Sequence, residues 1–352
     1  MISVFSCFNR RDVLAIGGAA MAASTFPMPA IGQSTTEINI GIANSSSDIS
    51  FFLAEKKGWF KEERLSIKTL AFNSAANMVV PLGAGHLDIG GGSASAGLYN
   101  AVSRGIKLRI VADKASSQPG YGVTKCLISK RHVESGRFKG LRDLRGMTVG
   151  MSGPGNSNWG NLWGALKVAG LNFADVKTVN MSYPDHVLAL QNNSIDASFT
   201  TEPSGTLAII KGFAVEATSD DKTRPYHASA QILFSEKMAS DLDLSTRFMR
   251  AYLRAVRYYH GALKEGRLAG ENAEEIISVL TEFTAIKDAD VYRIIVPNGI
   301  DPDGKIDIQT LKEDYEIYRS QGWIEGDATI EDVLDMSFVE AALKDLGPYK
   351  RI

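Results

Sequence analysis

The stretch "MTVGMSGPGNSNWGNLWGALKVAGL", residues 147–171, has the order of one α/β unit. The apolar run that ends at Gly150 is typical of a buried strand, and the run from Trp159 to Gly170 has helical character. Between them lies a loop rich in glycine, serine and asparagine, residues 151–158. A loop of this kind at a helix N-terminus brings backbone N–H groups toward an anion or a polar group. The stretch therefore predicts a strand, a binding loop and a helix.

Similar units recur along the chain. "INIGIANSSSDISFFLAEKKGWF", residues 38–60, again has the order of a strand, a small polar loop and a helix. A second pair, "LGAGHLDIGGGSAS" from Leu82 and "LQNNSIDASFTTEP" from Leu190, aligns Gly85 with Asn193 and Asp88 with Asp196. In both, we expect a helix to stop at a residue that tolerates positive φ and a short strand to follow. The repeated order predicts two similar lobes with mostly parallel strands.

Loops at equivalent positions of the two lobes are the candidate binding site. In an open parallel sheet, ligands bind beyond the carboxyl ends of the strands, near helix N-termini. If the lobes face each other, loops 44–48 and 92–95 line one wall of a cleft, and loops 152–159 and 200–202 line the other. The candidate ligand-binding residues are Asn44, Ser46, Asp48, Gly92, Ser93, Ala94, Lys114, Ser152, Asn156, Ser157, Asn158, Trp159, Thr201 and Glu202.

The residue types in these loops leave two ligand chemistries open. Serine and asparagine side chains donate hydrogen bonds to sulfonate, carboxylate or nitrate, and each helix N-terminus adds ~0.3–1 kcal/mol toward an anion. Lys114 is an anion contact, the partner of an acid or a solvated loop lysine, and the last of these is the commoner role. Trp159 either stacks on an aromatic ligand or packs in the core. The site therefore suits an anion or a polar aromatic molecule.

Composition and motifs argue against other classes of function. The formal net charge of −2 gives no reason to expect nucleic acid as a partner. The histidines are scattered without metal-ligand spacing, so we expect neither a metal nor a cofactor. Neither Ser93 nor Ser95 has the flanking glycines of a nucleophile elbow, and loop 153–160 lacks the Lys-Ser/Thr pair of a P-loop. Cys126 reads as a buried structural thiol. The sequence predicts a protein that is not an enzyme.

The first residues have the features of an export signal. Arg10 and Arg11 precede an apolar, alanine-rich run, which ends in prolines and the small-residue pattern at residues 30–32. This order predicts a signal peptide of the twin-arginine type over residues 1–32 and a periplasmic, soluble mature chain.

The ordered set of stretches resembles the substrate-binding proteins of bacterial ABC importers. The matching stretches are "LAEKKGWFKEERL", "VVPLGAGHLDIGGGSASAGLYNAVSRGIKLRIVA", "LRDLRGMTVGMSGPGNSNWGNLWGALKVAGL" and "LALQNNSIDASFTTEPSGTLAIIKG", which cover most of residues 38–215. They are similar to the aliphatic sulfonate, taurine and nitrate group, which overlaps the family named for thiamine-pyrimidine synthesis proteins.

The resemblance implies a type II periplasmic-binding fold, with two Rossmann-like lobes joined by two crossover strands near 121–129 and 227–234. Lobe I is expected over 36–120 and 230–352, with a helical C-terminal part, and lobe II over 121–229. Glu202 matches the family's acidic-Pro position near the cleft floor, where an acid accepts hydrogen bonds from a ligand or anchors the opposite wall.

The resemblance also implies a protein that captures a small organic anion by hinge closure and delivers it to an ABC permease, and we expect a monomer. The ligand that we expect is a sulfonate, a nitrate-like ion or an aromatic carboxylate. A thiamine-precursor pyrimidine or related heterocycle is the alternative ligand. A periplasmic enzyme or a sensor partner on the same fold is the alternative of another class. The cysteine-rich iron motif of the pyrimidine-synthesising relatives does not occur in this sequence.

Overall fold

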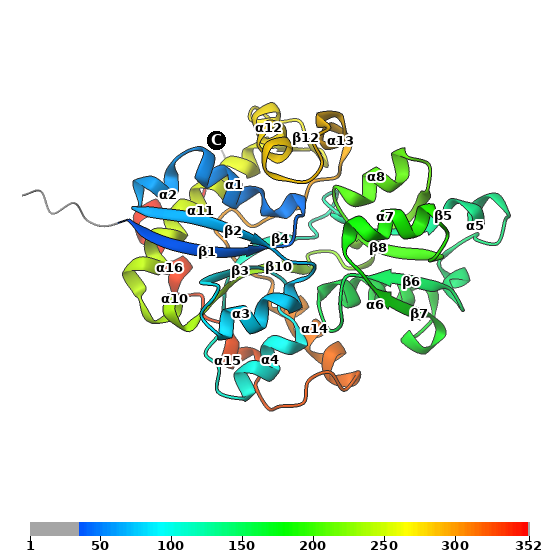
Figure 1. The fold of residues 1–352 in the computed structure, drawn as a ribbon, viewed down its shortest axis with the longest axis horizontal. Coiled ribbons are helices and arrows are strands. Elements are labelled where there is room, and N and C mark those ends of the chain that lie inside the picture. Colours follow the sequence, from blue (N-terminus) through cyan, green and yellow to red (C-terminus); the bar gives the residue numbers. More distant parts are fainter. Residues whose placement is uncertain (1–34, 351–352) are drawn as a thin grey trace, which may run out of the picture. The chain divides into compact units, whose positions relative to one another are not determined.

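Two five-stranded sheets with the same strand order organise the chain (Figure 1). The computed structural model describes residues 35–350, so the predicted signal peptide lies outside the described residues. The first sheet has the order β2-β1-β3-β10-β4, and the second has the order β7-β6-β8-β5-β9. The strands of the first sheet are β1 (Thr36–Ile42), β2 (Leu65–Ala71), β3 (Ile89–Gly92), β4 (Arg109–Ser116) and β10 (Ala228–Phe234). Those of the second are β5 (Thr124–Ser129), β6 (Thr148–Met151), β7 (Lys177–Asn180), β8 (Ala197–Thr201) and β9 (Ala214–Ser219).

Strand directions match between the sheets as well. β1 runs parallel to β2 and β3, and β6 runs parallel to β7 and β8. β10 is antiparallel to both its neighbours in the first sheet, and β5 is antiparallel to both its neighbours in the second. The chain passes from the first sheet to the second between Ser116 and Thr124, and returns between Ser219 and Ala228. The prediction of two similar α/β lobes is therefore confirmed.

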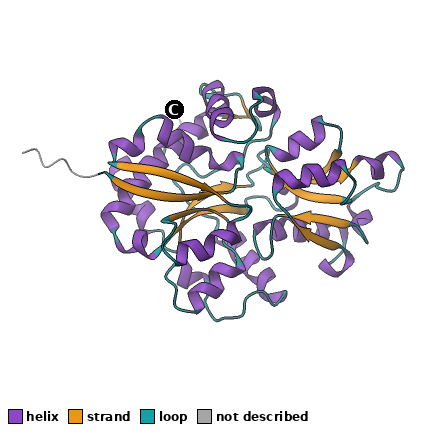
Figure 2. Cartoon of the chain, in the orientation of Figure 1, coloured by secondary structure: helices purple, strands orange, loops and turns teal. Residues whose placement is uncertain are grey.

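Helices cover both faces of each sheet (Figure 2). One face of the first sheet packs on α1 (Ile49–Lys56), α2 (Trp59–Glu62), α10 (Glu236–Ser240), α11 (Leu242–Ala262), α12 (Ala273–Phe283), α13 (Ala289–Ile294) and α16 (Ser337–Leu346). The other face packs on α3 (Val79–Gly83), α4 (Ala96–Ser103), α14 (Ile308–Ser320) and α15 (Ile330–Val333). The second sheet lies between α6 (Ser157–Ala169) and the pair α7 (Tyr183–Gln191) and α8 (Ser204–Ile210).

Short elements complete the fold. They are α5 (Lys130–Glu134), α9 (Asp220–Thr223), the hairpin of β11 (Leu263–Lys264) and β12 (Arg267–Leu268), and the 3-10 turns η1 (Ser46–Asp48), η2 (Ala75–Met78), η3 (Leu141–Leu144) and η4 (Phe173–Asp175). Within residues 35–350 no helix is both long enough and apolar enough to cross a bilayer.

The aligned residues of the two lobes have equivalent structural roles. Gly85 has a φ of 74° and Asn193 a φ of 63°, the left-handed values predicted at both helix ends. The Asp88 carboxylate accepts a hydrogen bond from the backbone N–H of Asn39 at 2.8 Å, which ties β3 to β1. The Asp196 carboxylate accepts one from the backbone N–H of Thr148 at 2.9 Å, which ties β8 to β6. An equivalent hydrogen bond from an aspartate therefore connects the central strand pair of each lobe.

Candidate functional site

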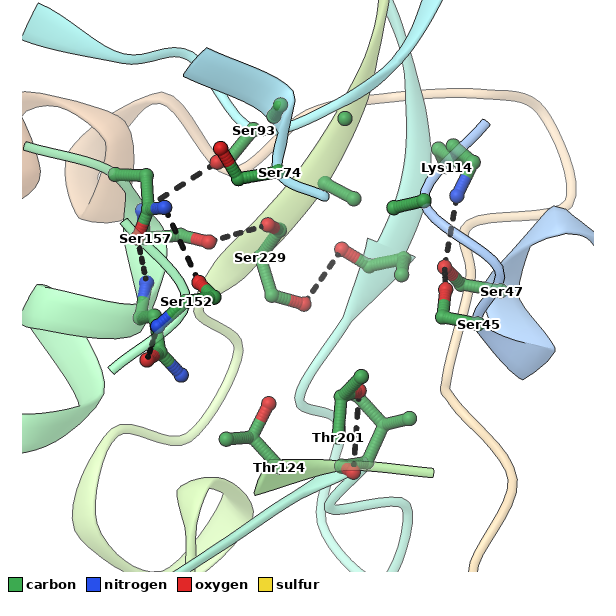
Figure 3. Close-up of a pocket in the computed structure, with 18 of the residues that line it drawn as sticks. Ser45, Ser47, Ser74, Ser93, Lys114, Thr124, Ser152, Ser157, Thr201 and Ser229 are labelled. Atoms are coloured by element: carbon green, nitrogen blue, oxygen red, sulfur yellow. Dashed lines mark hydrogen bonds between the residues drawn. The ribbon is translucent and has the colours of Figure 1, made fainter. Parts of the chain in front are cut away.

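A polar cavity of about 60 Å³ lies beyond the carboxyl ends of the parallel strands of both sheets. Figure 3 shows hydroxyl side chains from both sheets pointing into it. The polar lining residues are Ser45, Ser47, Ser74, Ser93, Lys114, Thr124, Ser152, Asn156, Ser157, Asn158, Asn161, Tyr183, Thr201 and Ser229. Small residues complete the wall: Ala43, Ala75, Gly91, Gly92, Ala115, Val123 and Ala230. The lining offers many hydrogen-bond donors and little apolar surface.

The wall formed by the first sheet carries a buried ion pair. Lys114, on β4, is 1% exposed, and its Nζ lies 2.9 Å from Oδ1 of Asp48 and 2.7 Å from Oγ of Ser47. The Asp48 carboxylate also accepts a hydrogen bond from the backbone N–H of Ser45 at 3.0 Å, which folds the turn η1. An ammonium has three N–H donors, so Lys114 keeps one for a molecule in the cavity.

The wall formed by the second sheet carries amides in place of charges. Asn158 accepts a hydrogen bond from the backbone N–H of Ser152 and donates one to the carbonyl of Phe199, both at 3.1 Å. Asn156 caps α6 by accepting from the backbone N–H of Asn158 at 3.1 Å, and its amide donates to Oγ of Ser152 at 3.2 Å. Many of the N–H donors that were expected to bind a ligand therefore hold the loop in shape. The polar groups that remain for a ligand belong to the amide and hydroxyl side chains.

Hydrogen bonds also join the two walls directly. The Ser157 hydroxyl donates to the carbonyl of Ser229 at 2.7 Å, and the backbone N–H of Ser157 donates to Oγ of Ser93 at 3.4 Å. At the rim, the backbone N–H of Ala96 donates to the carbonyl of Gly155 at 2.8 Å. These bonds link the N-terminal ends of α6 and α4, so both helix ends meet at the cavity.

The structure brings most of the predicted site residues together. Those that line the cavity are Gly92, Ser93, Lys114, Ser152, Asn156, Ser157, Asn158 and Thr201. Those that do not are Asn44, Ser46, Asp48, Ala94, Trp159 and Glu202. In the turn after β1, the lining side chains are Ser45 and Ser47, because η1 directs Asp48 to Lys114.

Glu202 and Trp159 have partners inside the protein. The carboxylate of Glu202 is fully buried and accepts hydrogen bonds from the backbone N–H of Thr206 at 2.8 Å and its hydroxyl at 2.7 Å. It also lies 3.4 Å from the Lys125 ammonium. The Trp159 ring packs edge-on against Trp323 with centroids 4.5 Å apart, and its indole N–H donates to the carbonyl of Gly153. Of the two interpretations of Trp159, the geometry supports core packing.

Several lining residues were missed by the sequence analysis. Ser74 lies in the loop that follows β2 and Tyr183 begins α7 after β7, and the rule that ligands bind beyond strand ends near helix N-termini covers both positions. Asn161 lies one helical turn beyond Ser157 and Asn158, so the 3.6-residue period places it on the same face. Thr124 begins β5 and Ser229 follows the first residue of β10, so both lie within the expected crossover strands, but no local pattern marks them as lining residues.

Burial shifts the pKa of several titratable groups in the two lobes. It raises the pKa of Asp113, the neighbour of Lys114, to about 7, and it raises that of Asp220 to about 7 as well. Burial lowers the pKa of His186 to about 4, so this ring is neutral at pH 7. Cys126 is buried as predicted, and burial raises its thiol pKa to about 12. Within residues 35–350 no cluster of three or more His, Cys, Asp or Glu side chains is arranged to hold a metal.

Comparisons with known proteins agree with this architecture. Residues 46–262 match the family model described as NMT1/THI5 like. A sequence search of curated proteins finds no match. Among solved structures, the alkanesulfonate-binding protein SsuA from Xanthomonas axonopodis pv. citri bound to MOPS is 16% identical, over 86% of this chain and 99% of that chain, with a TM-score of 0.68.

Two further structures show the range of proteins with this fold. The periplasmic nitrate-binding protein NrtA from Synechocystis PCC 6803 is 12% identical, over 90% of both chains, with a TM-score of 0.71. The desulfurization enzyme DSZB is 12% identical, over 88% of this chain and 99% of that chain, with a TM-score of 0.60. These likenesses show that the chain has the two-lobed periplasmic-binding fold.

Proposed function

Because the chain belongs to the NMT1/THI5-like family, we propose that it is the extracytoplasmic solute-binding protein of an ABC importer. It captures a small organic anion in the cavity between the two sheets. SsuA and NrtA, which share the fold, are by name binding proteins for alkanesulfonate and nitrate. Sulfonates, nitrate-like ions and aromatic carboxylates are accordingly the ligand classes that we expect.

The observation that carries this proposal is the charge of the lining. Lys114 supplies an ammonium, and none of the described residues that line the cavity is an aspartate or a glutamate. A carboxylate next to a bound anion raises the energy of the complex unless it is paired, whereas hydroxyl and amide donors lower it. Asp48 is paired with Lys114 on the side away from the cavity.

The size of the cavity supports a small charged group. A water molecule needs roughly 10–15 Å³ of such space, so a cavity of about 60 Å³ holds a group of a few non-hydrogen atoms. A nitrate ion or a sulfonate head has this size. A longer substituent on the ligand requires the lobes to open further.

Capture by hinge closure completes the proposal. Lobe I, residues 36–120 and 230–352, and lobe II, residues 121–229, move about the segments that connect the sheets. β10 begins at Ala228, ahead of the expected lobe boundary, so Ser229 moves with the first sheet. The bonds of Ser157 to Ser93 and Ser229 therefore belong to the closed form, and they break when the lobes part. The mature protein acts in the periplasm as a monomer and delivers its ligand to a permease in the inner membrane.

A neutral heterocycle is the second candidate ligand, and the ion pair favours it. Since the Lys114 ammonium lies 2.9 Å from the Asp48 carboxylate, the pair as a whole adds no net charge to the wall. A pyrimidine with several hydrogen-bonding groups matches a lining of hydroxyls and amides.

A melting-temperature screen of the purified mature protein distinguishes the two candidates. The panel contains ethanesulfonate, nitrate, benzoate and an aminopyrimidine. A ligand at ~100 times its Kd stabilises the native state by ~2.7 kcal/mol. We expect an anion to raise the melting temperature of the wild type and to leave that of the Lys114→Met/Asp48→Asn double variant unchanged. Stabilisation by the aminopyrimidine alone would contradict the anion proposal.

A further inference from the structure

A buried network of side chains ends at the cavity in the amide of Asn161. His227, which precedes β10, is 0% exposed, and its Nδ1 lies 2.9 Å from the Oδ1 position of Asn161. Its Nε2 lies 2.8 Å from Oδ2 of Asp314, on α14. Arg224 binds the other oxygen of Asp314, and it lies 3.0 Å from the half-exposed carboxylate of Glu313. The network therefore links α6, α14 and the segment that returns to the first sheet.

Glycines on α6 make room for this network. A side chain at Gly160 would collide with the guanidinium of Arg224 and the carboxylate of Asp314, and one at Gly164 would collide with the Arg224 stem. The spacing Gly160-x-x-x-Gly164 places both on one helix face. The glycines of "NWGNLWGAL" thus serve the close approach of α6 to the network, and Asn161, the residue after Gly160, lines the cavity.

The partners of His227 determine which of its nitrogens carries the proton. The ring is neutral at pH 7, because burial and the nearby Arg224 lower the pKa of His227, although Asp314 opposes this shift. Burial alone raises the pKa of Asp314, but His227 and Arg224 hold it below its ordinary value, so this carboxylate is ionised and only accepts. Nη1 of Arg224 also lies 3.1 Å from Nε2 of His227, but this guanidinium nitrogen donates to Asp314 itself. The closer 2.8 Å contact of Nε2 with the Asp314 carboxylate, which only accepts, requires a proton on Nε2, so Nδ1 is left as a bare acceptor.

A bare Nδ1 requires a donor from Asn161. The oxygen and nitrogen of an asparagine amide occupy interchangeable positions, and the hydrogen-bond network assigns them. With the NH₂ group of Asn161 turned to His227, its carbonyl oxygen is the atom that remains for the cavity. Among residues 35–350, Asn161 has no side-chain hydrogen bond other than that with His227.

We propose that Asp314 and His227 orient Asn161 so that its carbonyl oxygen faces the ligand, and that the site therefore selects an anion that also carries an N–H or O–H donor. This inference rests on the proposed function, because it assigns the polarity of the same cavity. Asn161 is the residue that determines specificity, and His227 and Asp314 are positioning residues. Lys114 meets the anionic group from the opposite wall, so the ligand has an acceptor end and a donor end.

Nitrogen-15 NMR of the ligand-free protein at pH 7 tests the orientation without a ligand. We expect the imidazole of His227 to carry its proton on Nε2, with Nδ1 unprotonated and coupled to the side-chain NH₂ of Asn161. His186→Gln is the matched control, because His186 is buried outside the cavity with its Nδ1 2.9 Å from Oγ1 of Thr200, and its removal leaves the His227 signals in place. A proton on Nδ1 of His227 would overturn the inference.

Calorimetry with a matched ligand pair tests the selectivity. The probes are 2-hydroxyethanesulfonate and ethanesulfonate, which share one charge and differ in one hydroxyl donor. We expect the wild type to bind the hydroxylated probe roughly tenfold more tightly, since one net hydrogen bond is worth up to ~1.5 kcal/mol.

Lining variants separate this inference from the proposed function. Asn161→Leu should bind both probes equally, and the control Asn73→Leu, at an exposed asparagine that does not line the cavity, should keep the preference. Equal binding of both probes by the wild type would overturn the selectivity of Asn161 and leave anion capture intact. Binding of neither probe would contradict sulfonate capture, and the NMR result would still decide the orientation of Asn161.

Discussion

The two walls of the cavity have the same place in the same topology, and they differ in chemistry. Each follows the carboxyl ends of parallel strands in a sheet of identical order. The first wall presents Lys114, whose charge is balanced by the buried Asp48. The second wall presents the amides of Asn156, Asn158 and Asn161 and no charged side chain among its described lining residues. The sheet topology determines where the polar groups lie, and the residues at the strand and helix ends determine which ligand chemistry they can bind.

The two walls are also stabilised by different kinds of interaction. A buried ammonium requires a counter-charge, so the first wall depends on one pair of residues. A buried amide requires hydrogen-bond partners, so the second wall depends on many weaker bonds. We therefore expect single substitutions to disturb the first wall more than the second.

Removal of the Lys114 charge is expected to have the largest effect. Lys114→Met leaves the Asp48 carboxylate buried without its ion pair, which costs about 3–5 kcal/mol. Chemical denaturation measures the free energy of unfolding. The Lys114→Met/Asp48→Asn double variant, in which no charge is left unpaired, should recover most of the loss. A single variant as stable as the wild type would show that the pair contributes nothing to the first wall.

Low pH is expected to lower the free energy of unfolding through a buried histidine behind the second wall. His186 lies under the loop, 3.4 Å from the position that a Cβ on Gly150 would take, and burial lowers its pKa to about 4. As the pH falls from 6.5 to 4, the unfolded chain binds a proton that the folded chain excludes, so stability falls. This loss amounts to roughly 3 kcal/mol.

The matched variant is His186→Gln, which has no titratable ring. Unfolding by urea at several pH values should give a free energy for this variant that falls less than that of the wild type between pH 6.5 and 4. Parallel pH profiles of the two proteins would exclude His186 as the cause.

A smaller effect is expected within the amide wall. Asn158→Ala removes the acceptor for the backbone N–H of Ser152 and the donor to Phe199, and it costs about 2 kcal/mol because these buried groups lose their partners. Asn73→Ala, at an exposed asparagine after β2, is the control and should be neutral. Equal unfolding free energies for the two variants would mean that Asn158 does not organise the loop.

The smallest effect is expected for one of the hydrogen bonds that join the walls. Ser157→Ala removes the hydrogen bond from the Ser157 hydroxyl to the carbonyl of Ser229 and should cost about 1 kcal/mol. Because we propose that this bond belongs to a closed form, X-ray scattering without ligand should also show a more open average shape than that of the wild type. An unchanged scattering profile would argue against a role of this bond in closure.

The repeated α/β framework of the two lobes could be predicted from the sequence. Gly85 and Asn193 have the predicted left-handed conformation, and Asp88 and Asp196 form equivalent bonds, because these features depend on residues close in the chain or on strand pairs that the repeat identifies. The helix predicted to end at Gly170 does so, with a φ of 68° at that residue.

Prediction of the site was less complete, for physical reasons. The turn after β1 was identified, but a 3-10 turn directs alternate side chains differently from an extended loop, so Ser45 and Ser47 line the cavity and Asn44 and Ser46 do not. Trp159 packs on Trp323, a residue far away in sequence that no local pattern could indicate.

Hydrogen exchange of both loops during ligand titration tests the central claim most directly. If a small anion binds between the two walls, the backbone amides of segments 43–53 and 151–162 become protected together, with the same dependence on the concentration of 2-hydroxyethanesulfonate. Protection of only one segment, or of neither while calorimetry detects binding, would contradict a site shared by the two walls.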